Sequence, residues 1–97
     1  MEHSEMLFDI NKLSLEEQKF FQQETLILEV TEKVSELMEK KKIDKIMLAE
    51  KIGKSPRYIT SFMRGTAKMD LRIISDIFFA LDSEIEIVPK KLSWKNK

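Results

Sequence analysis

Apolar residues recur at helical spacing in the first half of the chain. Ser14 and Glu17 match the S-x-x-E capping box that opens a helix, and helical sequence follows over about residues 15–41. The pattern allows one helix, or two helices with a break near residues 21–24. Its apolar stripe follows the period of a helix that buries one face and consists of Ile27, Val30, Val34, Leu37 and Met38.

Three shorter helices are predicted to follow, over residues 45–52, 56–64 and 71 to about 81. Each is preceded by a side chain that favours the N-cap position, namely Asp44, Ser55 and Asp70. Gly53 and Gly65 follow the first two, where glycine commonly ends a helix in the left-handed region. The core face expected for the last helix consists of Leu71, Ile74, Ile77, Phe78 and Leu81.

A short strand is predicted near the C-terminus. Apolar and acidic residues alternate over residues 84–87, and Pro89 closes the segment. One strand is not stable alone, so two partners are considered. One is the same strand of a second subunit, which we favour, and the other is residues 6–10, where alternation is weak.

The composition excludes several kinds of chemistry. Cysteine is absent and the single histidine is His3, so thiol and Ser–His catalysis and zinc sites lose their usual residues. No spacing selects a pair of carboxylates. We expect no catalytic residues, metal or cofactor, and no enzymatic activity. No apolar run approaches the roughly 20 residues that span a bilayer, and the N-terminus is acidic, so we expect a cytoplasmic protein without a membrane partner.

Charge is balanced overall but divided along the chain. The 97 residues carry 17 basic and 17 acidic side chains. Residues 1–39 have ten acidic and three basic side chains, a net charge of −7, whereas residues 40–97 have a net charge of +7. Residues 51–72 hold six basic side chains against Asp70 alone. Such local positive charge is typical of a nucleic-acid interface.

The predicted helices over residues 44–65 form a helix-turn-helix motif. Ala49 is small where the helices should cross, and Leu48, Ile52, Ile59 and Phe62 supply apolar contacts. The second helix then leaves a face of hydrogen-bonding groups without carboxylates, which suits a major groove. This face consists of Arg57, Tyr58, Thr60, Ser61 and Arg64.

The stretch IDKIMLAEKIGKSPRYITSFMRG, residues 43–65, resembles the helix-turn-helix domain of the Xre/Cro family, related to lambda repressor. Residues 71–87 are similar to the family's next helix and its short strand-like ending. The expected fold is therefore mainly α, a lambda-repressor-like bundle with a long acidic N-terminal helix and a short C-terminal strand. The expected division is residues 1–24 as an arm and the start of the long helix, 25–89 as the DNA-binding domain, and 90–97 as a basic tail.

The resemblance implies DNA contacts at the start of the second motif helix. Base contacts are implied for Pro56, Arg57, Tyr58 and Thr60. Phosphate contacts are implied for Lys45, Lys54, Ser55, Ser61, Arg64, Thr66 and Lys68. Two positions depart from the family: Lys45 stands where glutamine is common and suits a phosphate, and Pro56 has no donor. Specificity should therefore depend on Arg57 and Tyr58.

The acidic N-terminal helix in a chain of this length is similar to HigA-type antitoxins. The resemblance implies a sequence-specific DNA-binding regulator, a homodimeric repressor on a double-stranded operator, that is the antitoxin of a type II toxin–antitoxin pair and represses its own operon. The acidic segment would then bind a small basic ribonuclease toxin. The simpler interpretation of the acidic segment is the solvated face of a helix. The alternatives are a stand-alone or phage-type Xre regulator, and a toxin-neutralising adaptor with little DNA binding.

Several apolar side chains are candidates for a dimer or partner surface. They are Ile46, Met47, Ile73, Phe79, Ile85 and Ile87. For Ile46 and Met47 the favoured interpretation is packing under the long N-terminal helix. Trp94, in the basic tail, is either a packing anchor or exposed.

Overall fold

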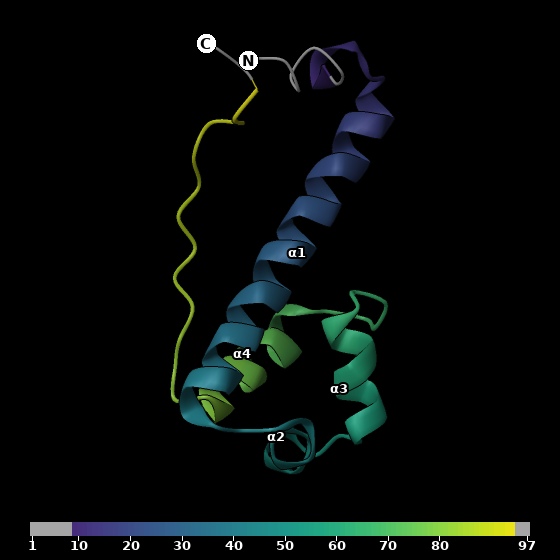
Figure 1. Ribbon diagram of the computed structural model, residues 1–97. Helices are drawn as coiled ribbons and strands as arrows, with labels where there is room; N and C mark the ends of the chain where they lie inside the picture. Colours follow the sequence, from purple (N-terminus) through teal and green to yellow (C-terminus); the bar gives the residue numbers. More distant parts are fainter. Residues whose placement is uncertain (1–8, 95–97) are drawn as a thin grey trace. The chain divides into compact units, whose positions relative to one another are not determined.

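A computed structural model describes residues 9–94 of the chain (Figure 1). The chain divides into two compact units. The first, here called the helical unit, is Ile27–Glu86, and the second, the terminal unit, comprises residues 9–26 and 87–94 of the described part. Helix α1, Leu15–Lys41, begins in the terminal unit and continues into the helical unit.

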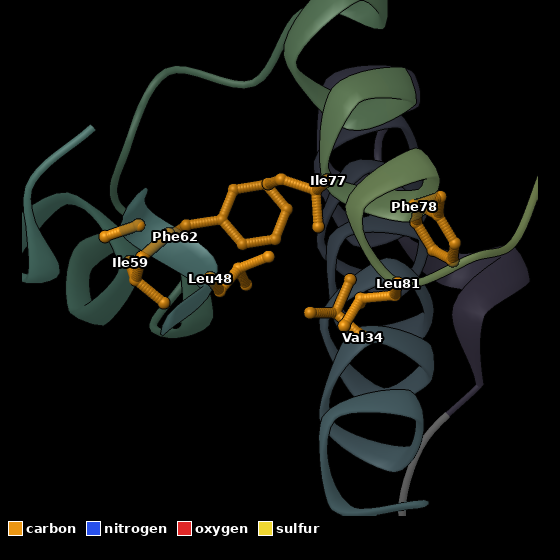
Figure 2. Packing of buried hydrophobic residues seen from close by; sticks show 8 residues of the cluster. Val34, Leu48, Ile59, Phe62, Ile77, Phe78 and Leu81 are labelled. Atoms are coloured by element: carbon orange, nitrogen blue, oxygen red, sulfur yellow. The ribbon is translucent and has the colours of Figure 1, made fainter. Parts of the chain in front are cut away.

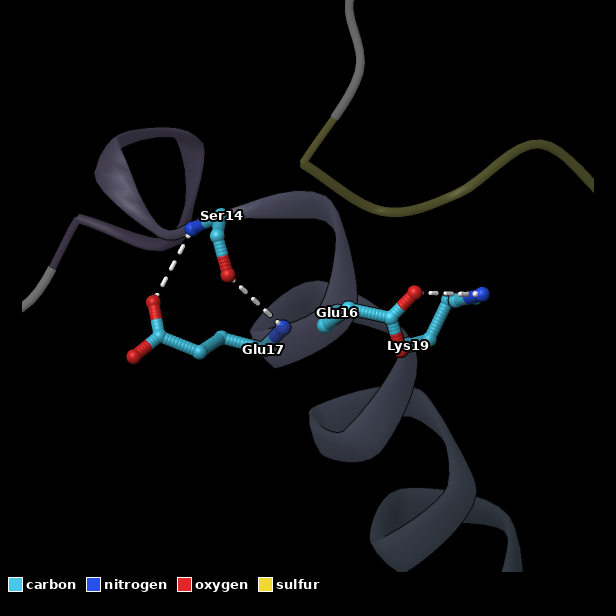
Figure 3. A network of polar contacts seen from close by, with 4 residues as sticks. All are labelled: Ser14, Glu16, Glu17 and Lys19. Carbon is cyan, nitrogen blue, oxygen red and sulfur yellow. Dashed lines mark hydrogen bonds and ion pairs between the residues drawn. The ribbon is translucent and has the colours of Figure 1, made fainter.

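Helix α1 is one helix without a break near residues 21–24. The predicted capping box is confirmed: the Ser14 N–H donates to Glu17 Oε1 at 2.9 Å, and the Glu17 N–H donates to Ser14 Oγ at 3.1 Å (Figure 3). These two bonds satisfy backbone donors that the first turn of a helix cannot satisfy internally. Glu16 forms an exposed ion pair with Lys19 one turn later, at 3.0 Å.

Three short helices complete the helical unit. They are α2, Lys45–Ile52, α3, Pro56–Met63, and α4, Leu71–Ala80. All three predicted N-caps are confirmed, because Asp44, Ser55 and Asp70 each accept a hydrogen bond from the backbone N–H three residues later, at 2.9–3.1 Å. Each such cap contributes about 1 kcal/mol to stability.

The helical unit has one core, to which all four helices contribute. Phe62 of α3 lies between Leu48 of α2 and Ile77 of α4, and Val34 of α1 lies beside Leu81 (Figure 2). These five side chains are fully buried. Val30, Leu37 and Met38 pack against the cluster, as the stripe on α1 predicts. The described chain is therefore mainly helical, as expected.

The strand predicted over residues 84–87 is not formed within the described part of the chain. These residues have no regular secondary structure. Alternation gives a segment the potential to pair, but a strand exists only when a second strand supplies hydrogen bonds. Ile10, one end of the alternative partner, begins the 3-10 helix η2, Ile10–Lys12. Residues 6–8 lie outside the described residues.

The prediction that Leu71 belongs to the core face of α4 is wrong. Leu71 is 73% exposed, whereas Ile77, Phe78 and Leu81 are buried and Ile74 is half-buried. Leu71 is the first residue of α4. It lies seven residues before the buried Phe78, and so nearly on the same side of the helix, but at the N-terminal end of α4, where the core leaves it uncovered. Leu71 instead shares an exposed face with residues four and eight positions later.

The terminal unit is held by contacts of Trp94. The Trp94 ring meets the Phe21 ring edge-on, with centroids 5.9 Å apart and planes at 82°. Asn11 Nδ2 donates to the Trp94 carbonyl at 3.5 Å. Of the two interpretations of Trp94, the structure thus supports a packing anchor. A shallow groove of about 390 Å³ on α1 is lined by Leu13, Glu16, Glu17, Phe20, Phe21 and Glu24.

Candidate nucleic-acid interface

The α2–α3 connection places the start of α3 at the surface. Gly53 has φ 71° and ψ 33°, a left-handed conformation that ends α2, and its N–H bonds back to the last turn. The Lys54 N–H donates to the Ala49 carbonyl at 2.9 Å, which completes the turn. Ser55 then caps α3 and Pro56 occupies its first turn, where a missing N–H costs nothing.

Helix α3 divides sharply into two faces. Ile59 and Phe62 are fully buried in the core. Arg57 is exposed on the other side, and no carboxylate of residues 9–94 lies within ion-pair distance of it. A guanidinium that is exposed and unpaired presents all five donors to a ligand.

Two predicted contact residues touch each other across α2 and α3. Lys45 Nζ lies 3.2 Å from Thr60 Oγ1 and donates to it. The Thr60 hydroxyl donates in turn to the Pro56 carbonyl at 3.3 Å. Because its single proton is used inside the helix, Thr60 offers a ligand only acceptor capacity. The Lys45 ammonium keeps two further donors, and its side chain is exposed.

The side chain of Tyr58 makes contacts within the protein, not with solvent alone. Its hydroxyl donates to the Lys68 carbonyl at 3.0 Å, and Lys54 Nζ lies 5.5 Å from the centre of its ring. Partial burial of the hydroxyl raises the pKa of Tyr58 above its usual 10.0, and the negative charge of Asp70 raises it further. Tyr58 thus ties α3 to the loop that follows it.

The loop over residues 64–70 is ordered by hydrogen bonds to one carbonyl group. The Ser61 carbonyl accepts from the Thr66 N–H at 3.0 Å and from the Thr66 hydroxyl at 3.1 Å. Gly65 turns the chain with φ 77°. These bonds leave Arg64 and Lys68 exposed on either side of the turn.

Positive charge dominates the surface of this region. Every cation of residues 51–72 is exposed, and within residues 9–94 none of them forms an ion pair; they are Lys51, Lys54, Arg57, Arg64, Lys68 and Arg72. The one carboxylate of the segment, Asp70, accepts from the Ile73 N–H at 2.9 Å and caps α4. An anion that approaches these cations therefore need not displace a carboxylate.

The candidate partner-surface residues differ in their exposure. Ile46 is 61% and Met47 is 42% exposed, so neither is buried under the long helix as the favoured interpretation expected. Ile73 is half-buried and packs against the core. Phe79, Ile85 and Ile87 are exposed, Phe79 most of all at 80%.

Sequence reasoning missed two features of this region. The bond from Tyr58 to Lys68 joins residues ten positions apart, and no local pattern indicates such a contact. The exposure of Leu71 also has no local signal, because Leu71 lies seven residues before the buried Phe78 and so nearly on the core side of α4. Among the described residues, no cluster of three or more His, Cys, Asp or Glu side chains is placed to hold a metal ion.

No family model, no curated protein and no solved structure matches the chain. Within residues 9–94, no helix combines the length and the apolar character that crossing a membrane requires.

Proposed function

We propose that α2 and α3 form a helix-turn-helix that binds double-stranded DNA, with α3 in the major groove, and that the protein is a sequence-specific transcriptional repressor. One observation carries this proposal. Six exposed cations without ion pairs among the described residues surround a short, well-capped helix with no carboxylate on its exposed face. Each cation that meets a phosphate releases condensed counterions, which drives binding.

Arg57 is the principal base reader in this proposal. It lies in the first turn of α3, the part of a recognition helix that reaches base edges. Its free guanidinium can make two parallel hydrogen bonds to guanine. Tyr58 contributes less than the sequence suggests, since its hydroxyl proton is already used. Pro56 and Thr60 contribute apolar contact and an acceptor.

The proposed phosphate contacts flank α3. They come from Lys45, Lys54, Ser55, Ser61, Arg64, Thr66 and Lys68. Lys68 and Arg64 are supported best, because the hydrogen-bonded loop presents both at the surface. The hydroxyls of Ser55 and Thr66 already have partners within the chain, so these two residues would act through their backbone groups or as acceptors.

A homodimer completes the proposal, because one helix-turn-helix makes few base contacts. Two copies whose reading helices lie about 34 Å apart would read a palindromic operator. Repression would follow from occupation of the operator.

The finer role that we propose is that of an antitoxin that represses its own operon. The groove on α1 supports a protein partner, because Leu13, Phe20 and Phe21 form an apolar floor beside three glutamates. Such a surface complements a small basic protein. A toxin-neutralising adaptor with little DNA binding is the second candidate function, and the same groove favours it.

Binding to random duplex DNA at several salt concentrations tests the main proposal. We expect the logarithm of the affinity to fall linearly with the logarithm of the salt concentration, with a slope near −0.9 for each phosphate neutralised. Lys68→Ala should reduce that slope by about one unit. Lys33→Ala, at an exposed lysine of α1 outside the cluster, is the matched control and should leave the slope unchanged. An affinity independent of salt would reject DNA binding and leave the adaptor.

The antitoxin role is tested by co-purification with the protein encoded in the neighbouring reading frame. If that neighbour is small and basic, the two proteins should co-purify. Glu24→Lys in the groove should then weaken the complex, while Glu36→Lys, at an exposed glutamate further along α1, should not. A neighbour that does not bind would leave a stand-alone regulator.

A further inference from the structure

One face of α4 is exposed although it carries large apolar side chains. Leu71 is 73% and Phe79 is 80% exposed, and Ser75 lies exposed between them in sequence. The three residues are spaced by four and so form one ridge along the helix surface. Ile77 and Phe78 of α4 are buried in the core, and the ridge borders this buried face, because Phe78 lies close to Leu71 around the helix. The ridge is therefore fixed in orientation by the core and has no cover within the described chain.

We propose that this ridge of α4 is the surface on which a second copy of the chain docks. The two copies of α4 would cross in antiparallel directions about a twofold axis through Ser75. In such an interface residue i contacts residue j, and residue j contacts residue i. The inference rests on the dimer of the proposed function and identifies the face that forms it.

The order of residues along the ridge suits a twofold axis. Leu71 and Phe79 lie equally far from Ser75, on either side of it. In an antiparallel pair, Leu71 of one copy therefore meets Phe79 of the other, and this contact occurs twice. Ser75 meets its own counterpart at the centre, where a small side chain lets the helices approach closely. Packing of such i, i+4 ridges is the commonest class of helix crossing.

The charges beside the ridge are complementary under the same symmetry. Arg72 and Asp76 are exposed on one flank of the ridge, and neither forms an ion pair within residues 9–94. Their mean position lies within one residue of Ser75, so the axis brings Arg72 of one copy close to Asp76 of the other, again twice. These two opposite-charge pairs favour a second copy of the chain as the partner that covers the ridge.

The size of the face predicts a weak dimer. Helix α4 has ten residues and is about 15 Å long. One such helix pair buries less than the roughly 1,200–2,000 Å² of a standard stable interface. We therefore expect a reversible dimer with a dissociation constant on the order of micromolar.

Sedimentation equilibrium of the full chain without DNA tests the surface. The wild type should show a reversible monomer–dimer equilibrium, and Phe79→Arg should weaken it at least about tenfold. Leu28→Arg, at an exposed apolar residue of α1 outside every candidate dimer surface, is the control and should leave the equilibrium unchanged. A wild type that stays monomeric to millimolar concentration overturns the inference. So does a dimer that Ile87→Lys dissociates while Phe79→Arg does not.

A charge exchange tests the twofold geometry itself. Arg72→Asp alone places like charges opposite each other and should weaken the dimer, and Asp76→Arg alone should do the same. The double variant restores the complementary pairs and should recover most of the wild-type affinity. Circular dichroism verifies that each variant keeps its helices. A double variant as weak as the single ones would overturn the twofold pairing.

The outcome is separable from the proposed function. Random-duplex binding by Phe79→Arg reports phosphate contact by the monomer, with no need of the dimer. A monomeric wild type that still binds DNA with the expected salt dependence overturns the α4 interface and leaves the proposed function intact. A wild type that forms a dimer sensitive to Phe79→Arg but does not bind DNA supports the α4 interface and overturns the proposed function.

Discussion

The hydroxyl of Tyr58 donates a hydrogen bond to the backbone carbonyl of Lys68, at 3.0 Å. This bond joins α3 to the loop that precedes α4. The Nζ atom of Lys54 lies 5.5 Å from the centre of the Tyr58 ring. The Tyr58 ring also packs against Phe62, with ring centroids 6.4 Å apart. Tyr58 therefore links α3 to this loop, and its hydroxyl proton is already used within the protein.

Tyr58→Phe should lower the free energy of unfolding by about 0.5–1 kcal/mol, the lower part of the range for one hydrogen bond, because the Lys68 carbonyl remains accessible to water. Chemical denaturation measures the change. Affinity for random duplex DNA should change little. A large loss of discrimination at one base position, with stability unchanged, would instead assign Tyr58 to base contact.

The titration of Tyr58 should begin above the usual range. Burial, and next the charge of Asp70, raise its pKa above 10.0. The folded state then holds the proton more tightly than the unfolded state, so this contribution to stability is complete below pH 10 and is lost at higher pH. Tyrosinate absorbance measures the pKa directly, because the chain has one tyrosine. Asp70→Asn, which preserves the N-cap, should lower the pKa only partly.

Two glycines in the left-handed region should respond differently to alanine. Gly53 and Gly65 have φ of 71° and 77°. A Cβ at Gly53 would meet nothing within 4 Å, whereas a Cβ at Gly65 would lie 2.9 Å from Ile27 Cγ2. Gly53→Ala should cost about 1 kcal/mol through backbone strain alone, and Gly65→Ala should cost more. Equal losses in thermal unfolding would contradict the steric difference.

Trp94 offers a fluorescent probe of the terminal unit, because it is the one tryptophan of the chain. Its indole Nε1 is buried without a hydrogen-bond partner among the described residues, and its ring meets Phe21. Phe21→Ala should admit water to the indole and shift its emission to longer wavelength. Leu28→Ala, at an exposed residue of the same helix, should leave the emission unchanged. A spectrum of Phe21→Ala identical to wild type would show that the contact does not shield Trp94.

Arg57 and Lys68 should have separable effects on DNA. Arg57→Ala should cost about 1–3 kcal/mol on an operator and relax the preference at one base position. Lys68→Ala should weaken all sequences alike. Binding to an operator selected from random sequences, and to single-base variants of it, measures both. Equal losses on operator and random DNA for Arg57→Ala would remove its assigned role.

The local elements could be predicted from the sequence because their signals are local. The capping box at Ser14 and Glu17, and the caps at Asp44, Ser55 and Asp70, act over three residues. All four form as predicted. Of the candidate site, the sequence indicated the cations of residues 51–72 and the exposed face of α3, because helical period alone separates Arg57 from Ile59 and Phe62.

Contacts between distant positions were decided by the tertiary structure. The tether from Tyr58 to Lys68, the bond from Lys45 to Thr60 and the pairing of Phe21 with Trp94 depend on how elements pack. The strand predicted at residues 84–87 does not form within the described single chain, because alternation cannot supply the second strand that a ladder needs. The sequence by itself thus determined where helices begin and end and which charges surround α3. Packing decided that Tyr58 is tied down, that Leu71 and Phe79 stay exposed, and that Arg57 is left free.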